Sequence, residues 1–294
     1  MKPAKFDYHD PTTLDEALGL MAQFGDQARP LAGGQSLVPL MNFRLIRPAH
    51  LIDLNGVAEL SYLKMDDGTL RLGATTRQRE LERSMIVAKH WPLLNEAASY
   101  IGHVQIRNRG TVGGSLAHAF PSAELPVAMV TLDASFTLRS KTNRRTARAE
   151  GFFLSYMTTT LQSDELLTEI SVPVLPAQSG WSYHEVSRRH GDFALAGAAS
   201  IVALDANGTI QHARLTLTGT TPIRSRQAEE FLLGERPSDA LFRAVARRAI
   251  ENLEQDSDIH ASAEYRREVC AVLARRALMR AAQRSAEQMK GKTQ

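Results

Sequence analysis

Two short stretches, Ala32-Gly33-Gly34-Gln35-Ser36 and Thr111-Val112-Gly113-Gly114-Ser115, set the architecture that this sequence predicts. Each contains two adjacent glycines and ends in a small hydroxyl side chain. Adjacent glycines can adopt a positive φ and leave backbone N–H groups uncovered. Successive exposed N–H groups form a concave anion site. Two such loops in one chain therefore predict a diphosphate held from two sides, which points to a dinucleotide.

Neither glycine pair matches the usual nucleotide-binding patterns. A Rossmann site needs Gly-x-Gly-x-x-Gly between a strand and a helix, and a P-loop needs Gly-x-x-x-x-Gly-Lys before a Ser or Thr. The sequence contains neither pattern. Because a lone Gly-Gly pair more often serves a turn than a ligand, the prediction depends on there being two pairs with matching hydroxyl ends.

Composition limits the classes of protein that the chain can belong to. A length of 294 residues favours two domains or one large one. The net charge of +3 gives no strong case for nucleic acid. The single cysteine, Cys270, excludes an intrachain disulfide and a cysteine-ligated metal or iron–sulfur cluster built by this chain alone. With no hydrophobic signal region and no apolar run long enough to span a membrane, we expect a soluble, cytoplasmic protein.

We expect the N-terminal part, residues 1–177, to form two lobes, at about 1–57 and 58–177. In the first lobe a strand, a glycine turn, a helix and another strand follow one another, which describes a small α/β unit. Thr13 and Glu16 have capping-box spacing, which predicts a helix start. The pattern predicts strands at 28–32, 51–54, 60–65, 70–74, 136–139 and 167–172, and helices from Thr13, from Ser36, around Gln78–Leu81 and at about 91–101.

A cluster of Pro, Ser and Gly at residues 173–180 marks the predicted boundary to a second domain, 178–288. Antiparallel strands followed by helices predict an α+β domain with a small sheet. Residues 289–294 are expected to be a disordered tail. The basic stretch from Ser262 predicts a solvated helix face, with a docking face for a partner as the alternative. The domain's strands are predicted near 182–186, 199–204 and 214–218, and its helices near 226–233, 237–253 and 261–286.

A few polar side chains near the second glycine pair could serve a ligand. Arg107 or Arg109 could balance phosphate charge, unless their stretch is simply a solvated loop. Glu124 could accept hydrogen bonds from sugar hydroxyls, or it could be an acid favoured at a helix N-terminus. His103 and His118 lack partners at metal-ligand spacing, so no metal site is predicted. No nucleophile–base pattern stands out, so no catalytic residue is assigned, and the chain looks like the holder of a cofactor that does its own chemistry.

These motifs resemble the two FAD-binding motifs of the medium, flavoprotein subunits of the molybdenum hydroxylases, the family of carbon monoxide dehydrogenase and xanthine dehydrogenase. The resemblance covers nearly the whole chain. It implies a two-lobed FAD-binding domain of the PCMH type followed by the α+β C-terminal domain. The further landmarks, in the right order, are Phe6-Asp7-Tyr8, Leu51-Ile52-Asp53-Leu54, Ile106-Arg107-Asn108-Arg109-Gly110, Glu165-Leu166-Leu167, Gly191-Asp192-Phe193-Ala194 and Ala263-Glu264-Tyr265-Arg266-Arg267.

The resemblance also implies roles for individual residues. Residues 32–36 and 111–115 are expected to wrap the FAD diphosphate. Ile101, Gly102 and Phe193 are expected near the flavin ring, Glu124 near the ribityl or ribose hydroxyls, and Leu167 near the adenine. The full predicted cofactor site is Ala32, Gly33, Gly34, Gln35, Ser36, Ile101, Gly102, Thr111, Gly113, Gly114, Ser115, Ala117, Glu124, Leu167 and Phe193.

Three positions depart from the family pattern. Phe120 stands where many members have Asp or Ser, and Phe193 lacks the hydroxyl of the Tyr that some relatives carry. Gln35 stands where related flavin folds often carry His, which can be the covalent flavin link elsewhere in the superfamily. Because an amide cannot make that link, we expect FAD to be bound non-covalently.

The function that the resemblance implies is electron transfer within a complex. The chain is expected to be the FAD-dependent dehydrogenase component, an oxidoreductase subunit. It would take electrons from [2Fe-2S] clusters on a small subunit and pass them to an external acceptor, while a large molybdenum-cofactor subunit hydroxylates the substrate. A dimer of heterotrimers is expected. Two alternatives stay open: a stand-alone FAD reductase of the related cell-wall-precursor type, and a scaffold subunit that has lost the cofactor.

Overall fold

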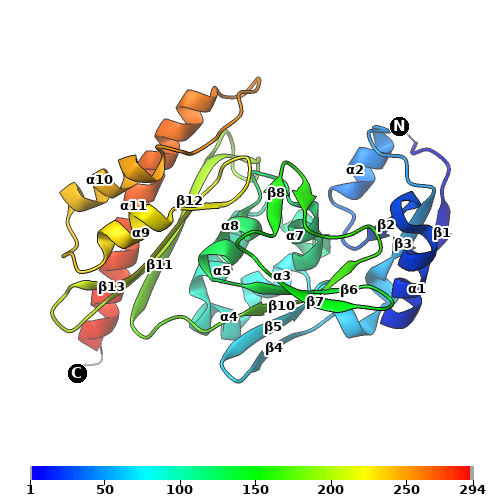
Figure 1. Cartoon of the computed structure of the whole chain (residues 1–294), viewed down its shortest axis with the longest axis horizontal. Helices are drawn as coiled ribbons and strands as arrows, with labels where there is room; N and C mark the ends of the chain where they lie inside the picture. Colours follow the sequence, from blue (N-terminus) through cyan, green and yellow to red (C-terminus); the bar gives the residue numbers. More distant parts are fainter. Residues whose placement is uncertain (1, 292–294) are drawn as a thin grey trace. The chain divides into compact units, whose positions relative to one another are not determined.

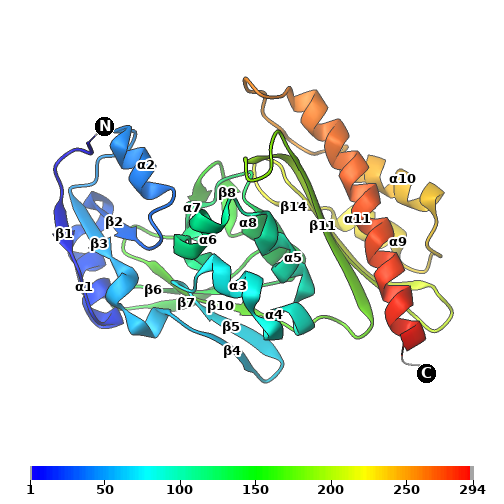
Figure 2. The same cartoon turned by 180° about the vertical axis from the view of Figure 1, so that it is seen from behind.

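The computed structural model describes residues 2–291, which form two compact units, each built from three separate segments (Figures 1 and 2). The first unit comprises the chain up to Arg83, His103–Ala119 and Ala134–Pro173. The second comprises Ser84–Gly102, Phe120–Asp133 and the chain from Val174. The division into domains after residue 177 stays a prediction.

Three sheets, five α-helices and three short 3-10 helices make up the regular structure described in the first unit. A parallel sheet has the order β1-β3-β2, an antiparallel sheet has the order β4-β5-β10-β6-β7, and β8 pairs with β9. Its elements are β1 (Asp7–His9), α1 (Leu14–Phe24), β2 (Ala28–Leu31), α2 (Leu37–Asn42), β3 (His50–Asp53), β4 (Leu63–Asp66), β5 (Thr69–Gly73), α3 (Gln78–Arg83), α6 (Val104–Arg109), α7 (Val112–His118), β6 (Ser135–Arg139), β7 (Arg144–Arg148), β8 (Phe153–Ser155), β9 (Thr158–Thr159) and β10 (Leu166–Val172).

Helix α1 begins where the capping-box spacing predicts. The Thr13 hydroxyl accepts the Glu16 N–H at 3.2 Å, and the Glu16 carboxylate accepts the Thr13 N–H in return. Gly25 ends the helix with φ 48°. The buried face of α1 packs on the parallel sheet, because its apolar positions recur at helical spacing. The core that results contains Leu14, Ala17, Leu18, Met21, Ala28, Ile52, Leu54, Val57, Leu60 and Leu166.

The second unit is built on one antiparallel sheet of order β11-β12-β13-β14. Alternate residues of β12 point to opposite faces. One face packs against α11, α9 and α10, and the other against α5 and α8. Its elements are α4 (Met85–His90), α5 (Pro92–Tyr100), α8 (Glu124–Thr131), β11 (Ser179–Ser187), β12 (Ala194–Leu204), β13 (Ile210–Leu217), β14 (Ile223–Arg224), α9 (Arg226–Leu232), α10 (Asp239–Ala249) and α11 (Ala263–Gly291).

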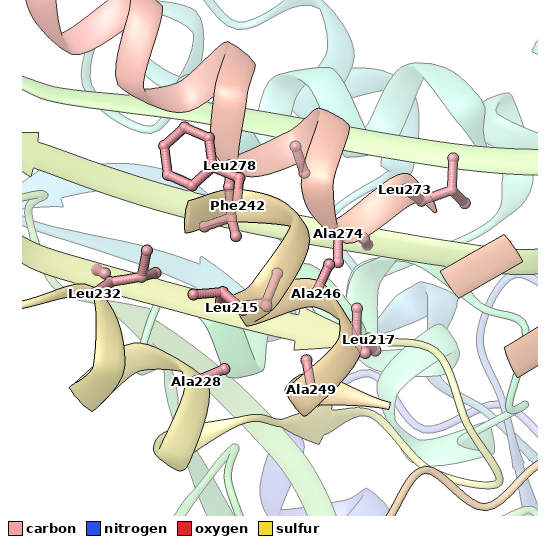
Figure 3. Packing of buried hydrophobic residues seen from close by; sticks show 14 of the residues in the cluster. Leu215, Leu217, Ala228, Leu232, Phe242, Ala246, Ala249, Leu273, Ala274 and Leu278 are labelled. Atoms are coloured by element: carbon pink, nitrogen blue, oxygen red, sulfur yellow. The ribbon is translucent and has the colours of Figure 1, made fainter. Parts of the chain in front are cut away.

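The core under α11 is dominated by small and branched apolar side chains (Figure 3). Alanines at the contact let the long helix lie close to the strands, and leucines fill the space between α11, α10 and β13. Cys270 is buried in this core, which agrees with the absence of any partner cysteine in the sequence. The labelled members of the cluster are Leu215, Leu217, Ala228, Leu232, Phe242, Ala246, Ala249, Leu273, Ala274 and Leu278.

A single carboxylate connects three elements of the second unit. Glu96, on α5, accepts hydrogen bonds from the Trp181 indole at 3.1 Å, from the Tyr183 backbone N–H at 3.1 Å and from Arg284 at 2.6 Å. Arg284 also lies over the Trp181 ring, 4.8 Å from its centroid. These contacts join α5, β11 and α11.

The mixed fold confirms the predicted α+β class, and the longer elements lie where the sequence predicts them. The solvated loop that we considered for residues 103–110 is instead the short helix α6. Helix α11 includes residues 289–291 of the expected tail, and residues 292–294 lie outside the described residues. No helix in the described part of the chain is long and apolar enough to cross a membrane.

Candidate flavin site

The first glycine loop connects β2 to α2 and presents unpaired backbone donors. Gly34 has φ 71°, a conformation that favours glycine. Among the described residues, no acceptor lies within hydrogen-bond distance of the N–H groups of Gly33, Gly34, Gln35 or Ser36. The Ser36 hydroxyl makes no capping bond to α2. This loop therefore has the free N–H groups that an anion site requires.

The second glycine pair has a different structure from the one its sequence suggests. Both glycines lie in the first turn of α7, with ordinary φ angles. The Gly113 N–H donates to the Ala74 carbonyl at 2.8 Å, and the Gly114 N–H donates to the Thr111 hydroxyl at 3.1 Å. Both N–H groups are thus bonded within the chain. The prediction that the second glycine pair presents free N–H groups to an anion was therefore wrong.

The glycines of the second pair instead allow close packing. A Cβ at Gly113 would lie 2.6 Å from the Ala74 Cβ, and one at Gly114 would lie 2.6 Å from the Thr111 hydroxyl. Gly113 therefore requires glycine, because its neighbours include the Ala74 backbone, whereas a Cβ at Gly114 would displace the Thr111 hydroxyl that caps α7. The pair sets how tightly the N-terminus of α7 lies on the chain after β5.

The two loops touch one another within the first unit. A Cβ at Gly33 would lie 2.4 Å from the Arg109 carbonyl oxygen and 2.8 Å from the Gly110 Cα. A Cβ at Gly114 would lie 3.8 Å from the Ala32 Cβ. The structure therefore brings residues 32–36 and 111–115 to one place, although they are far apart in the sequence.

Arg107 and Arg109 have different environments. Arg107 is buried, and its guanidinium makes two hydrogen bonds to the Glu82 carboxylate, at 2.8 and 3.1 Å. These contacts lower the pKa of Glu82 against the raising effect of its burial. Arg107 thus anchors α6 to α3, whereas Arg109 is exposed and is the one of the two that could balance phosphate charge.

The other predicted cofactor residues are divided between the units. Ala117 is exposed on α7 and Leu167 is buried on β10, both in the first unit. Ile101, Gly102, Glu124 and Phe193 belong to the second unit. Their roles toward FAD stay predictions.

Within the second unit, Phe193 and Phe120 form an aromatic pair. Their ring centroids lie 4.6 Å apart, and the Phe193 side chain is 71% exposed. The two positions that depart from the resembled family pattern therefore meet in one contact between two apolar rings. Aromatic pairs of this spacing attract one another beyond the area that they bury.

Glu124 is buried in the first turn of α8 and belongs to a group of acids and tyrosines. The Tyr183 hydroxyl, which is fully buried, lies 3.4 Å from the Glu185 carboxylate, and the Tyr100 ring lies 5.3 Å from the Tyr183 ring. Burial and the neighbouring charge of Glu124 raise the pKa of Glu185 to about 8. Glu185 therefore holds a proton in the folded protein at neutral pH.

We expect this proton to make the stability of the folded chain depend on pH. The pKa of Glu185 rises from an ordinary 4.5 to about 8 on folding, so the folded state binds the extra proton between these values. Stability is then fully present below about pH 4.5 and falls as the pH rises toward 8, by at most about 1.4 kcal/mol per pH unit. Glu185→Gln should flatten this fall.

Urea unfolding midpoints measured across this pH range compare the wild type with Glu185→Gln. Glu230→Gln is the control, because Glu230 is exposed on α9. Equal pH slopes for the wild type and Glu185→Gln would contradict the assignment.

Sequence reasoning missed Arg77 and Asn55, which lie beside both glycine loops. The Arg77 guanidinium donates to the Arg109 carbonyl and, at 2.7 Å, to the Asn55 side-chain oxygen. The Asn55 amide donates to the Ala32 carbonyl at 2.9 Å. Nothing in the sequence pattern marks either residue, because their roles depend on three segments that meet only in the folded chain.

The residues present fit FAD in the first unit. The first loop offers four backbone donors without acceptors, and Gly33 and Gly114 let the two loops lie directly against each other. Such donors suit a diphosphate. Among the described residues, no group of three or more His, Cys, Asp or Glu side chains could hold a metal. Burial lowers the pKa of His118, so this residue is neutral at pH 7.

Four unpaired N–H groups in a glycine loop are typical of proteins that bind a phosphate-bearing cofactor. Comparison with known proteins gives the family of this chain. Residues 4–175 match the model of the FAD binding domain in molybdopterin dehydrogenase, and residues 181–281 match the CO dehydrogenase flavoprotein C-terminal domain. The chain belongs to the FAD-binding medium subunits of the molybdenum hydroxylases.

Similar proteins match along nearly their whole length. The 6-hydroxypseudooxynicotine dehydrogenase complex subunit alpha of Paenarthrobacter nicotinovorans is 43% identical, over 97% of each chain. The caffeine dehydrogenase subunit beta of Pseudomonas sp. (strain CBB1) is 40% identical, over 97% of each chain. A structure of carbon monoxide dehydrogenase from Hydrogenophaga pseudoflava superimposes with a TM-score of 0.94 at 39% identity, covering 97% of this chain and 99% of that one.

Proposed function

We propose that this chain carries FAD for a heterotrimeric molybdenum hydroxylase and delivers electrons to an external acceptor. The observation that carries the proposal is the cradle formed by residues 32–36 and 109–114, with its four free N–H groups. FAD supplies the redox chemistry when bound, because a flavin can exchange electrons both with one-electron carriers and with two-electron acceptors. The chain itself binds and orients the cofactor.

Individual residues have distinct tasks in this proposal. The backbone N–H groups of residues 33–36 bind the diphosphate, and Gly33 and Gly114 allow the loops to approach closely enough for both to reach it. Arg109 adds positive charge at the same loop. Ile101, Gly102, Glu124, Leu167 and Phe193 are proposed to contact the rest of FAD. The amide of Gln35, which donates to the Gly33 carbonyl at 3.0 Å, leaves the cofactor unlinked.

The proposed partners are a small iron–sulfur subunit and a large molybdenum subunit. Relatives are named as a subunit of a dehydrogenase complex and as medium chains, which supports this assignment. The proposal includes a dimer of heterotrimers and a cytoplasmic location. It assigns the choice of substrate to the large subunit, and so not to this chain.

We expect the complex, purified through a tag on this chain, to contain stoichiometric FAD. Acid precipitation should release all of it into the supernatant, because the site offers no covalent link at Gln35. The absorption spectrum of the denatured chain and the flavin content of the supernatant check both points.

Each alternative predicts a different result of that experiment. Absence of flavin bands would favour the cofactor-free scaffold. Turnover of a carbon substrate by the isolated chain with FAD bound would favour the stand-alone reductase. Flavin retained on the precipitated chain would contradict non-covalent binding.

A further inference from the structure

Arg77 lies directly between the two glycine loops. Its backbone is fixed from both sides, because the Thr76 carbonyl accepts the Val112 N–H at 2.9 Å and the Gln78 N–H donates to the Gly110 carbonyl at 2.9 Å. The Arg77 side chain then reaches across to the first loop. A guanidinium suits this place, since its planar fork can bond two acceptors at once.

The two acceptors of Arg77 belong to different loops. One is the carbonyl oxygen of Arg109, at the start of the second loop. The other is the side-chain oxygen of Asn55, whose amide nitrogen holds the Ala32 carbonyl at 2.9 Å. Arg77 and Asn55 therefore form a bridge from the second loop to the first.

Asp53 orients Asn55 for this task. Its carboxylate accepts the Asn55 backbone N–H at 2.9 Å and also the Asn55 side-chain amide. The Tyr8 hydroxyl donates to the other Asp53 oxygen at 2.6 Å, and this contact raises the pKa of Tyr8 to about 12. With its nitrogen committed to Asp53 and Ala32, Asn55 presents its oxygen to Arg77.

The charge of Arg77 is not neutralised by this bridge. Both of its acceptors are uncharged oxygens, and no carboxylate of the described chain lies within ion-pair distance of its guanidinium. By contrast, Arg79 and Arg107 nearby are both paired with Glu82. The Glu80 carboxylate accepts the Arg77 backbone N–H at 3.2 Å but makes no ion pair with its guanidinium. A guanidinium without an ion-pair partner, bonded to the Arg109 carbonyl that lies against Gly33, favours an anion at that place.

We propose that Arg77 and Asn55 are positioning residues that hold the two glycine loops in the FAD-binding arrangement, and that the charge of Arg77 strengthens binding of the diphosphate. This inference rests on the proposed function, since it concerns the same site. It adds two residues that lie outside both glycine motifs and a role for an arginine that no motif marks.

The test measures how fast FAD leaves the purified complex, from the rise of free-flavin fluorescence after dilution. Arg77→Gln should release FAD about 10–100 times faster than the wild type, because a hydrogen bond to a charged group contributes roughly 1.5–3 kcal/mol. Asn55→Ala should give about a tenfold increase. Arg83→Gln is the matched control: Arg83 is an exposed arginine at the end of α3, the helix that begins directly after Arg77, and its replacement should leave release unchanged.

Two further readouts separate positioning from a general loss of stability. The double variant Arg77→Gln/Asn55→Ala should release FAD no more than about twice as fast as Arg77→Gln, since both changes break one bridge. Arg77→Lys keeps the positive charge but loses the planar guanidinium that bonds two acceptors, so FAD binding by this variant should stay as salt-dependent as in the wild type. In Arg77→Gln, which loses the charge, the salt dependence of FAD binding should be weaker.

Several outcomes would overturn the inference. The first is an FAD release rate in Arg77→Gln equal to that of the wild type. The second is a release rate in the double variant that is the product of the two single effects, and the third is an equal salt dependence of FAD binding in Arg77→Lys and Arg77→Gln. If Arg77→Gln does not fold, Asn55→Ala decides alone, because Asn55 is exposed and its loss leaves no core cavity. A wild-type chain without FAD would instead defeat the proposed function.

Discussion

Gly33→Ala is expected to remove FAD from the complex while leaving the fold of the chain intact. The added Cβ would lie 2.4 Å from the Arg109 carbonyl oxygen and 2.8 Å from the Gly110 Cα. Both are backbone atoms, so they cannot swing aside as a flexible side chain can. The loops must then move apart by about 1 Å to reach ordinary contact, and a displacement of that size at a binding site can cost about a hundredfold. We expect FAD affinity to fall at least that far.

The measurement is the flavin content of the purified complex, with far-UV circular dichroism to confirm the fold. Gly19→Ala is the matched control in the same unit. A Cβ at Gly19 meets nothing within 4 Å, and the residue lies inside α1, where alanine is favoured by up to about 1 kcal/mol. Full flavin content in Gly33→Ala would show that the loops do not meet on the cofactor as proposed.

Among glycine-to-alanine substitutions in the second unit, Gly180→Ala is expected to lower the stability of the fold most. A Cβ on Gly180 would lie 1.8 Å from the Ala281 carbonyl oxygen and 2.5 Å from the Ser285 backbone nitrogen. Helix α11 cannot move away from β11 without breaking hydrogen bonds, because the Ser285 hydroxyl donates to the Gln178 carbonyl at 2.7 Å and accepts the Leu204 N–H at 3.0 Å. We expect a loss of about 4 kcal/mol or more in the free energy of unfolding.

Chemical denaturation followed by tryptophan fluorescence measures this loss, since both tryptophans, Trp91 and Trp181, belong to the second unit. Gly208→Ala serves as the control. Its Cβ would enter open space, and its positive φ of 77° should cost only about 1–2 kcal/mol. If the two variants unfold at the same denaturant concentration, α11 does not press on β11 as described.

The sequence allowed correct prediction of those elements whose signals are local. Thr13 and Glu16 begin α1 where their capping-box spacing predicts it. Helices α6 and α7 were missed because each spans only about two turns, too short for a hydrophobic period to appear. The glycine pair in α7 usually indicates a turn, so the sequence pattern did not predict a helix there.

The glycine motifs predict Gly33 and Gly114 as cofactor residues, but the packing reason for each glycine became visible only with the neighbouring atoms in place. Arg77 and Asn55 could not be found, because an arginine between two loops looks like any surface arginine in the sequence. The coupling of Glu124 to Glu185 was hidden for the same reason: the residues are distant in sequence and adjacent in space.

The assembly of each unit from three separate segments affects how the polypeptide can be divided and how it is made. Helices α5 and α8 lie in the chain before residue 134, but the strands that they cover begin only at Ser179. A polypeptide that stops at the predicted boundary after residue 177 thus retains two helices whose apolar faces have lost their sheet. During synthesis α5 and α8 must wait for β11–β13, and the sheet in turn waits for α11. The second unit can therefore close only after every segment of the first unit has been synthesised.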